Sequence, residues 1–174
     1  IRLCFAEKEL FLTQLRAALR ASAYGPLQIM FPMVGSLEDI RKAKEYLNLA
    51  KEQLKERKQQ FDEQIRIGIM IEIPAIALIA DLAAEEVDFA SIGSNDLTQY
   101  LSAADRMNPE VAAYYKSDST AMLRLLGFVF REFSKREKEI SVCGEMAGNP
   151  ETAQLLVGLG ARKLSMSSGN IAGV

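Results

Sequence analysis

Short, mostly apolar runs alternate along this chain with longer stretches in which apolar residues recur at helical spacing. Runs of this length are typical of buried strands, and the stretches between them are typical of amphipathic helices. The runs are QIMFPMV (28–34), RIGIMIEI (66–73), VDFASIG (87–93), EISVCG (139–144) and KLSMS (163–167). Strict alternation of strands and helices predicts an α/β fold with a parallel sheet and right-handed crossovers.

The predicted helices have recognisable starts and stops. Serine or asparagine caps, a proline at the first position and a glycine after the last are the usual signals. They place helices over residues 6–22, ended by Gly25 and Pro26; from Ser36 and Asp39 to about residue 60; along PAIALIADLAAEE, which begins at Pro74; around the apolar stripe 122–133; and from Asn149 and Pro150 to Gly160. The charged run KEQLKERKQQ in the second helix is interpreted as its solvated face.

Five strands with four helical crossovers leave two kinds of parallel sheet open. A doubly wound sheet can be built from five strands, whereas a (β/α) barrel needs eight. The helix at residues 6–22 has no strand before it, which suggests that the chain begins within a fold. No linker, repeat or low-complexity segment divides residues 1–174, so we expect one domain or a large piece of one.

Composition narrows the classes of function. The 174 residues are 49% apolar and 25% charged, as in an ordinary globular domain, and the net charge of −2 gives no sign of a nucleic-acid or membrane partner. Cys4 and Cys143 are too few and too far apart for a disulfide framework or a zinc site, so we expect reduced thiols in a cytoplasmic protein. Histidine is absent, which excludes it as base, metal ligand or phosphate carrier within these residues.

Chemically reactive side chains lie at or just after the ends of three of the five runs. Glu72 comes at the end of the second run, Asn95 and Asp96 come directly after the third, and Cys143 lies near the end of the fourth. The carboxyl ends of parallel strands meet at one edge of the sheet, where ligands bind. We therefore expect one site with two carboxylates suited to a hard cation, an amide and a thiol.

Each candidate residue also has a simpler interpretation. Glu72 could form a salt bridge with a neighbouring basic side chain, since an unpaired carboxylate is costly to bury. Asn95 and Asp96 could be a turn and helix cap, which spacing alone favours. Cys143 could be a small buried apolar residue, and Arg106, in ADRMN, could be a solvated loop charge.

Several motifs resemble, in order and spacing, the phosphoenolpyruvate-binding domain of Enzyme I of the bacterial sugar phosphotransferase system: IMFPMV, GIMIEIPA, FASIGSNDLTQY, ADRMN, CGEMAGN and LLVGLGARKLSMS. The resemblance covers nearly the whole chain. Pyruvate phosphate dikinase and phosphoenolpyruvate synthase share the same barrel and much of SIGxNDLTQ, but CGEMAG and DRMN are closer to Enzyme I. The family's domain is an eight-stranded (β/α) barrel, and the chain resembles strands four to eight of it.

The resemblance implies a role for each residue at the strand ends. Glu72 and Asp96 match the family's magnesium ligands, and Asn95, Asp96 and Arg106 match residues that bind phosphoenolpyruvate. Cys143 matches the acid that protonates the enolate carbon of pyruvate. Together they imply Mg²⁺-dependent transfer of the phosphoryl group of phosphoenolpyruvate to a histidine on another domain. Pyruvate is released, and the transfer is the first step of sugar uptake and phosphorylation.

The same resemblance implies the partners. They are phosphoenolpyruvate and pyruvate, the histidine-bearing domain of the same enzyme and, through it, the histidine-containing phosphocarrier protein, and a second copy in a homodimer. The family's phosphate-binding arginines precede this segment, so we expect the chain alone to be inactive. Two alternatives stay open. One is a fragment of a dikinase or synthase, and the other is a non-catalytic fragment that folds or dimerises.

The chain departs from the family pattern at several positions. Ser94 stands where threonine is usual, and Asn149 replaces a common aspartate. The loop YYKSDSTAM (114–122) lacks the usual prolines, and the ending SSGNIAGV also differs. None of these changes falls on the residues assigned to the site.

Overall fold

The computed structural model describes all 174 residues. Its centre is one sheet of five parallel strands: β1 (Gln28–Phe31), β2 (Arg66–Ile71), β3 (Phe89–Gly93), β4 (Glu139–Cys143) and β5 (Leu164–Ser165). The strands pair in the order of the sequence, without the reversal that defines a doubly wound sheet. The predicted α/β class is confirmed, and the strand order is that of part of a (β/α) barrel.

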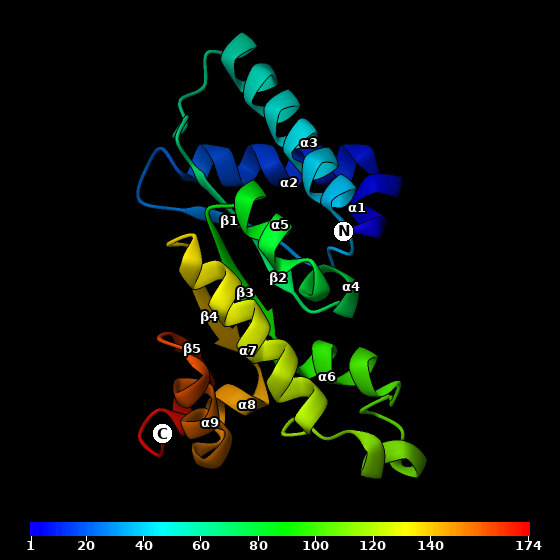
Figure 1. Ribbon diagram of the computed structural model, residues 1–174. Coiled ribbons are helices and arrows are strands. Elements are labelled where there is room, and N and C mark those ends of the chain that lie inside the picture. The colour runs from blue at the N-terminus through cyan, green and yellow to red at the C-terminus, as the bar shows by residue number, and fades with distance from the viewer.

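Helices connect the strands and cover one face of the sheet (Figure 1). They are α1 (Arg2–Ala6), α2 (Lys8–Ala21), α3 (Leu37–Glu56), α4 (Pro74–Leu78), α5 (Ala80–Glu86), α6 (Ser94–Ser102), α7 (Thr120–Lys135), α8 (Glu145–Gly148) and α9 (Pro150–Leu159), with 3₁₀ turns η1 (Pro109–Tyr114) and η2 (Ser168–Asn170). In Figure 1, α5 and α7 lie across the strands, and α2 packs against α3 at the β1 side. No helix here combines the length and apolar content needed to cross a membrane.

The helix boundaries follow most of the predicted signals, but α3 ends at Glu56 rather than near residue 60, and α6 and α8 were not among the predicted helices. The Ser36 hydroxyl accepts a hydrogen bond from the Asp39 N–H at 3.2 Å, so the predicted cap of α3 is confirmed. The helix predicted over 6–22 is α2, and a separate short helix, α1, precedes it, because the backbone leaves the helical region at Glu7. The helix predicted along PAIALIADLAAEE is broken at Ile79.

The strands are shorter than the apolar runs that contain them. β1 ends at Phe31 because Pro32 has no N–H to donate to the ladder. Met33 then adopts a positive φ of 54°, and its N–H donates to Glu72 Oε1 instead of continuing the ladder. β5 has only two residues, Leu164 and Ser165, which pair with the end of β4. These early ends leave the residues after each strand free to form the edge of the sheet.

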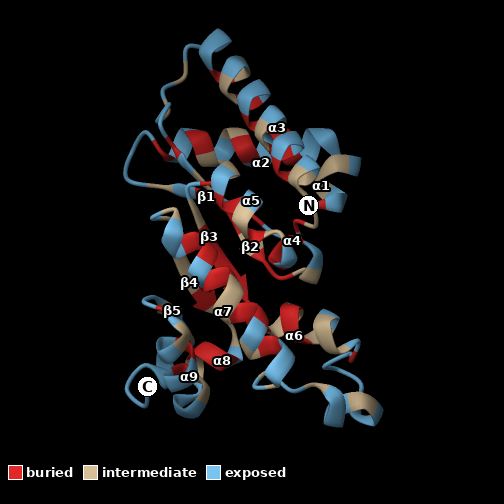
Figure 2. Cartoon of the chain, in the orientation of Figure 1, coloured by how far each residue is buried: buried red, intermediate tan, exposed pale blue.

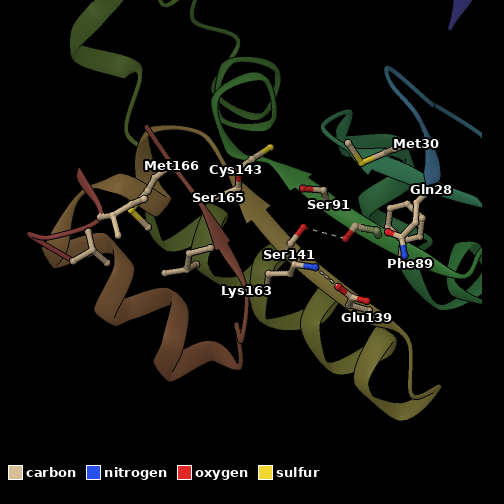
Figure 3. A pocket seen from close by; sticks show the side chains of 14 residues that line it. Gln28, Met30, Phe89, Ser91, Glu139, Ser141, Cys143, Lys163, Ser165 and Met166 are labelled. Atoms are coloured by element: carbon tan, nitrogen blue, oxygen red, sulfur yellow. Dashed lines mark hydrogen bonds and ion pairs between the residues drawn. The ribbon is translucent and has the colours of Figure 1, made fainter. Parts of the chain in front are cut away.

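The two faces of the sheet differ in polarity. The face covered by helices carries side chains that are at most 9% exposed: Ile29, Phe31, Ile69, Ile71, Ala90, Ile92 and Val142. Figure 2 shows buried residues concentrated on the strands and on the inward sides of α2, α3 and α7. The other face opens on a cavity of 670 Å³, seen in Figure 3, and carries Met30, Ser91, Glu139, Ser141 and Lys163. Side chains alternate between these faces along each strand.

Candidate functional site

Glu72 follows β2 directly and is held at the carboxyl edge by two local features. Its side chain is only 3% exposed, and the Met33 N–H donates to its Oε1 at 2.6 Å. A Cβ added to Gly93 would lie 2.7 Å from Glu72 Oε2, so β3 must end in glycine for the carboxylate to fit. Burial raises the pKa of Glu72, the Met33 N–H opposes this, and the negative charge of Asp96 raises the pKa further.

No basic side chain forms an ion pair with Glu72. The simpler interpretation of this residue as half of a salt bridge is therefore wrong. A buried carboxylate beside a second carboxylate is costly unless a cation balances the charge. Glu72 and Asp96 therefore form an anionic pair at the strand ends that favours a cationic ligand.

Asp96 lies in the first turn of α6 and points to a basic partner. The N-cap of α6 is Gly93, and no side chain caps this helix, so the interpretation of Asn95 and Asp96 as a cap is wrong. Asp96 Oδ1 accepts from Arg106 Nη1 at 3.2 Å. The Arg106 N–H in turn donates to Gln99 Oε1 at 3.1 Å, which fixes the loop after α6 against that helix.

Asn95 bridges α6 to the connection after β4. Its Oδ1 accepts from the Glu145 N–H at 3.0 Å, and a Cβ on Gly144 would lie 2.8 Å from the same oxygen. Gly144 has a φ of 104°, a conformation that favours glycine. The bond from the Glu145 N–H to Oδ1 fixes the orientation of the Asn95 amide. The two N–H donors of Nδ2 are therefore available to a ligand. Two free donors suit an anionic oxygen.

Cys143 ends β4 on the open face of the sheet. It is half-buried, and its Sγ donates to the Ile92 carbonyl at 3.4 Å. The residue lines both the 670 Å³ cavity, where Figure 3 shows it near Ser165 and Met166, and a second cavity of 360 Å³. Cys143 is therefore accessible and is not the small core residue of the simpler interpretation.

The structure joins the predicted residues in two neighbouring sets. Glu72, Asp96 and Arg106 form one set through charge and contact. Asn95 and Cys143 line the 360 Å³ cavity together. The expectation that one cavity receives all these side chains is not met by either of these two cavities. The adjacent positions of Asn95 and Asp96 in α6 place the sets side by side.

Sequence reasoning missed several supports of this edge. The hydroxyl of Ser94 is fully buried and donates to the Cys143 carbonyl at 2.7 Å, which ties α6 to β4. The Tyr115 hydroxyl donates to the Asn95 carbonyl at 3.2 Å. The Met33 N–H and Gly93 hold Glu72 as described. Only the glycine ending the strand had a visible signal in the sequence, because the other contacts join distant residues.

The donor set at this edge is small. No group of three or more His, Cys, Asp or Glu side chains converges on a point, so the two carboxylates are the protein's anionic donors. A cation such as Mg²⁺ is usually held by one or two carboxylates, with waters and substrate oxygens completing the shell. The fold is a singly wound α/β sheet with a polar site at the ends of its strands. The carboxylates of this site suit a cation, and its amide and guanidinium donors suit an anion.

Comparisons with known proteins agree with this class. All of residues 1–174 match the family model described as PEP-utilising enzyme, PEP-binding domain. Similar curated proteins include the phosphoenolpyruvate-protein phosphotransferases of Listeria monocytogenes and Bacillus subtilis, 50% and 48% identical over 171 residues that cover 98% of this chain. The chain spans 30% of the length of both relatives. The chain belongs to the family of PEP-binding domains of PEP-utilising enzymes, and the resemblance predicted from its motifs is confirmed.

Solved structures with lower identity support the fold. A malate synthase of Haloferax volcanii matches with a TM-score of 0.60 and 18% identity, covering 84% of this chain and 44% of that chain. An HpcH/HpaI aldolase from Desulfitobacterium hafniense matches with a TM-score of 0.57 and 17% identity, covering 87% of this chain and 61% of that chain. At these identities the likeness concerns the fold alone.

Proposed function

We propose that the chain binds phosphoenolpyruvate with Mg²⁺ at the carboxyl edge of its sheet, as part of a phosphoenolpyruvate-protein phosphotransferase. The observation that carries this proposal is the buried, raised-pKa carboxylate of Glu72 next to Asp96, with Arg106 across from Asp96. This arrangement offers both signs of charge within one small region. A ligand with a phosphate, a carboxylate and an accompanying divalent cation matches it.

Glu72 and Asp96 would hold the metal ion. The fit rests on the lack of an ion-paired basic side chain at Glu72 and on the oxygen-only donor set that Mg²⁺ prefers. When bound, Mg²⁺ supplies positive charge that neutralises substrate oxygens and stabilises a developing enolate. The Met33 N–H and the absence of a side chain on Gly93 keep the carboxylate of Glu72 in place for this role.

Asn95 and Arg106 would hold the phosphate. The free Nδ2 donors of Asn95 and the guanidinium of Arg106 are hydrogen-bond donors that suit phosphate oxygens, and a guanidinium can bind them in pairs. Arg106 is paired with Asp96 at 3.2 Å. Sharing Asp96 with a metal ion would weaken that pair and free Arg106 for the substrate.

Cys143 would supply the proton that completes pyruvate. The P–O bond of phosphoenolpyruvate breaks as the phosphoryl group moves to a histidine nitrogen, and the enolate that remains takes a proton from the Cys143 thiol at its terminal carbon. The resulting thiolate regains a proton from water. The Ser94 hydroxyl, bonded to the Cys143 carbonyl, fixes the backbone that carries the thiol.

The acceptor histidine would lie outside these residues, because the 174 residues contain none. We place it in the histidine-bearing domain of the same enzyme, which then passes the phosphoryl group to the histidine-containing phosphocarrier protein in the cytoplasm. We also propose that two copies of this domain associate as a homodimer. The support for these partners is the similarity to phosphoenolpyruvate-protein phosphotransferases.

Calorimetric titration with phosphoenolpyruvate tests the proposed site. We expect binding in Mg²⁺ that is greatly weakened in EDTA, and weaker binding of pyruvate, which lacks the phosphate. Cys143→Ala is the matched control, because it should bind phosphoenolpyruvate like the wild type. Binding that is indifferent to EDTA, or no binding at all, would contradict the proposal.

Measuring pyruvate release tests whether the chain needs an acceptor histidine on another domain. The chain alone should release no pyruvate from phosphoenolpyruvate, since it lacks an acceptor histidine. Robust release by the chain alone would show that a histidine acceptor is unnecessary. In an enzyme that contains all domains, Cys143→Ala should still form phosphohistidine but release pyruvate slowly, because enolate protonation loses its acid.

A further inference from the structure

The long connection between α6 and α7, residues 103–119, contains two adjacent tyrosines that the proposed mechanism does not use. Tyr115 is half-buried, and its hydroxyl donates to the Asn95 carbonyl at 3.2 Å. The preceding residue, Tyr114, has the same side chain but is 70% exposed. Two adjacent tyrosines thus have opposite surroundings, and only one of them contacts the site.

The phenol of Tyr115 lies among the charged groups of the strand edge. Burial raises its pKa, the negative charge of Glu145 raises it further, and the guanidinium of Arg106 opposes both. Arg106 belongs to the same loop, and its guanidinium pairs with Asp96, the residue next to the Asn95 whose carbonyl accepts from the phenol. A phenol oxygen that donates one hydrogen bond can still accept another, so it can be a second partner for a guanidinium.

We propose that Tyr115 is a positioning residue that holds the loop and Arg106 against the first turn of α6. This inference rests on the proposed function, in which a cation at Asp96 competes with Arg106 for the same carboxylate. Arg106 then needs a neutral partner to stay over the phosphate. Tyr115 provides one, and its bond to the Asn95 carbonyl anchors the loop to the residue that also binds substrate.

The test compares Tyr115→Phe with Tyr114→Phe, which removes the same hydroxyl from an exposed position. Phosphoenolpyruvate affinity is measured by calorimetry in saturating Mg²⁺, and Tm by thermal unfolding. We expect Tyr115→Phe to weaken binding about fivefold, the size of one net hydrogen bond, with little change in Tm. Tyr114→Phe should match the wild type in both measurements.

A double-mutant cycle separates positioning from a merely structural role. If Tyr115 acts through Arg106, adding Tyr115→Phe to Arg106→Ala should cause no further loss of affinity. An equal fivefold loss in both backgrounds would overturn the proposal, because Tyr115 would then act independently of Arg106. Wild-type affinity in Tyr115→Phe would overturn it as well.

A ligand-free measurement keeps the inference separate from the proposed function. Trypsin cleavage after Arg106, followed by mass spectrometry, reports how firmly the loop is held. We expect Tyr115→Phe to speed cleavage there several-fold, with no change after Arg57, the C-cap residue of α3. If the wild type binds no phosphoenolpyruvate, the proposed function is contradicted. If Tyr115→Phe leaves the rate of cleavage after Arg106 unchanged, the role of Tyr115 is contradicted.

Discussion

The open face of the sheet carries one glutamate at each end, and the two have opposite surroundings. At the amino end, Lys163 Nζ donates to Glu139 Oε1 at 2.5 Å, and Arg66 lies 3.5 Å from Glu139 Oε2. These partners, Lys163 first, lower the pKa of Glu139. At the carboxyl end, Glu72 forms no ion pair with a basic side chain, and burial raises its pKa. Figure 3 shows Glu139 joined to Lys163, with Cys143 at the other end of the same strand.

The difference shows which end stabilises the fold and which end is prepared for a ligand. A paired carboxylate satisfies its charge within the protein and contributes to folding. An unpaired, buried carboxylate opposes folding and retains a strong preference for a cation from outside. The same residue type therefore forms ion pairs at one end of the sheet, whereas at the other end it has the binding role that we propose for Glu72.

Asp96→Asn should have the largest effect on binding. The variant keeps the shape of the side chain and an oxygen for Arg106 but removes a formal charge from the proposed metal site. We expect Mg²⁺-dependent affinity for phosphoenolpyruvate to fall roughly a hundredfold, or about 3 kcal/mol, as measured by calorimetry. Glu139→Gln, which removes a charge at the other end, is the control and should bind normally. Full Mg²⁺-dependent binding by Asp96→Asn would reject Asp96 as a ligand.

Glu72→Gln should reduce binding and increase stability. The glutamine keeps an oxygen for the Met33 N–H, yet the lost charge should lower Mg²⁺-dependent affinity about tenfold or more.

The stability effect of Glu72→Gln has a defined pH dependence. The pKa of Glu72 is higher in the folded state than its ordinary value of 4.5. The wild type therefore loses stability as the pH rises from 4.5 through the folded-state pKa, and below pH 4.5 its stability is not reduced by this group. Without Mg²⁺, the variant should therefore melt a few degrees higher than the wild type at pH 7, and the difference should vanish below pH 4.5. A variant less stable than the wild type at pH 7 would contradict this interpretation.

Gly93→Ala should have an intermediate effect on binding. The new Cβ would meet Glu72 Oε2 at 2.7 Å and Glu72 Cβ at 2.9 Å, so the carboxylate must move. We expect roughly a tenfold loss of phosphoenolpyruvate affinity, since the site depends on the position of that carboxylate. Gly25→Ala is a matched control, because nothing lies within 4 Å of a Cβ at that position. Equal affinity in the two variants would show that the close approach at Gly93 is unimportant.

Glu139→Gln should have the smallest effect, and its sign is opposite to that of Glu72→Gln. The Glu139 side chain is 40% exposed, so solvent screens its ion pairs and the loss of stability should be at most about 1 kcal/mol. Because the folded-state pKa of Glu139 is lowered, its contribution is present above the ordinary value of 4.5 and is lost as the pH falls through the lowered pKa. Denaturant unfolding at pH 7 and pH 3 measures this difference. If Glu139→Gln were more stable than the wild type at pH 7, Glu139 would not stabilise the fold and would not differ from Glu72 in this respect.

Much of the fold could be predicted because its signals are local. Apolar period and cap residues located all five strands and a helix in each connection between them. The Ser36 hydroxyl caps α3 as expected, although the Asp39 carboxylate accepts from the Gly35 N–H and not from Ser36. Placing Glu72 and Asp96 at one edge required only the rule that parallel strands end together. The break at Ile79 was not predicted, because apolar residues continue through it, and the short helix α1 and the helices α6 and α8 were not predicted either.

The contacts of the site could not be predicted, because they join residues far apart in the chain. Met33 and Glu72 are separated by 39 positions, and Asn95 and Glu145 by 50. The sequence offered a helix cap for Asn95, whereas the fold uses its side chain to bind the connection after β4. Choosing between such alternatives requires knowing which backbone N–H approaches which oxygen.

The sequence by itself determined the α/β class, the order of the elements and the chemical types available at the strand ends, since these depend on periodicity and residue identity over short spans. Only the tertiary structure decided that Glu72 is buried without a basic partner while Glu139 has two. The reason is physical. The pKa and binding capacity of a carboxylate depend on the charges, donors and solvent that surround it in space, and packing brings these together from distant parts of the chain.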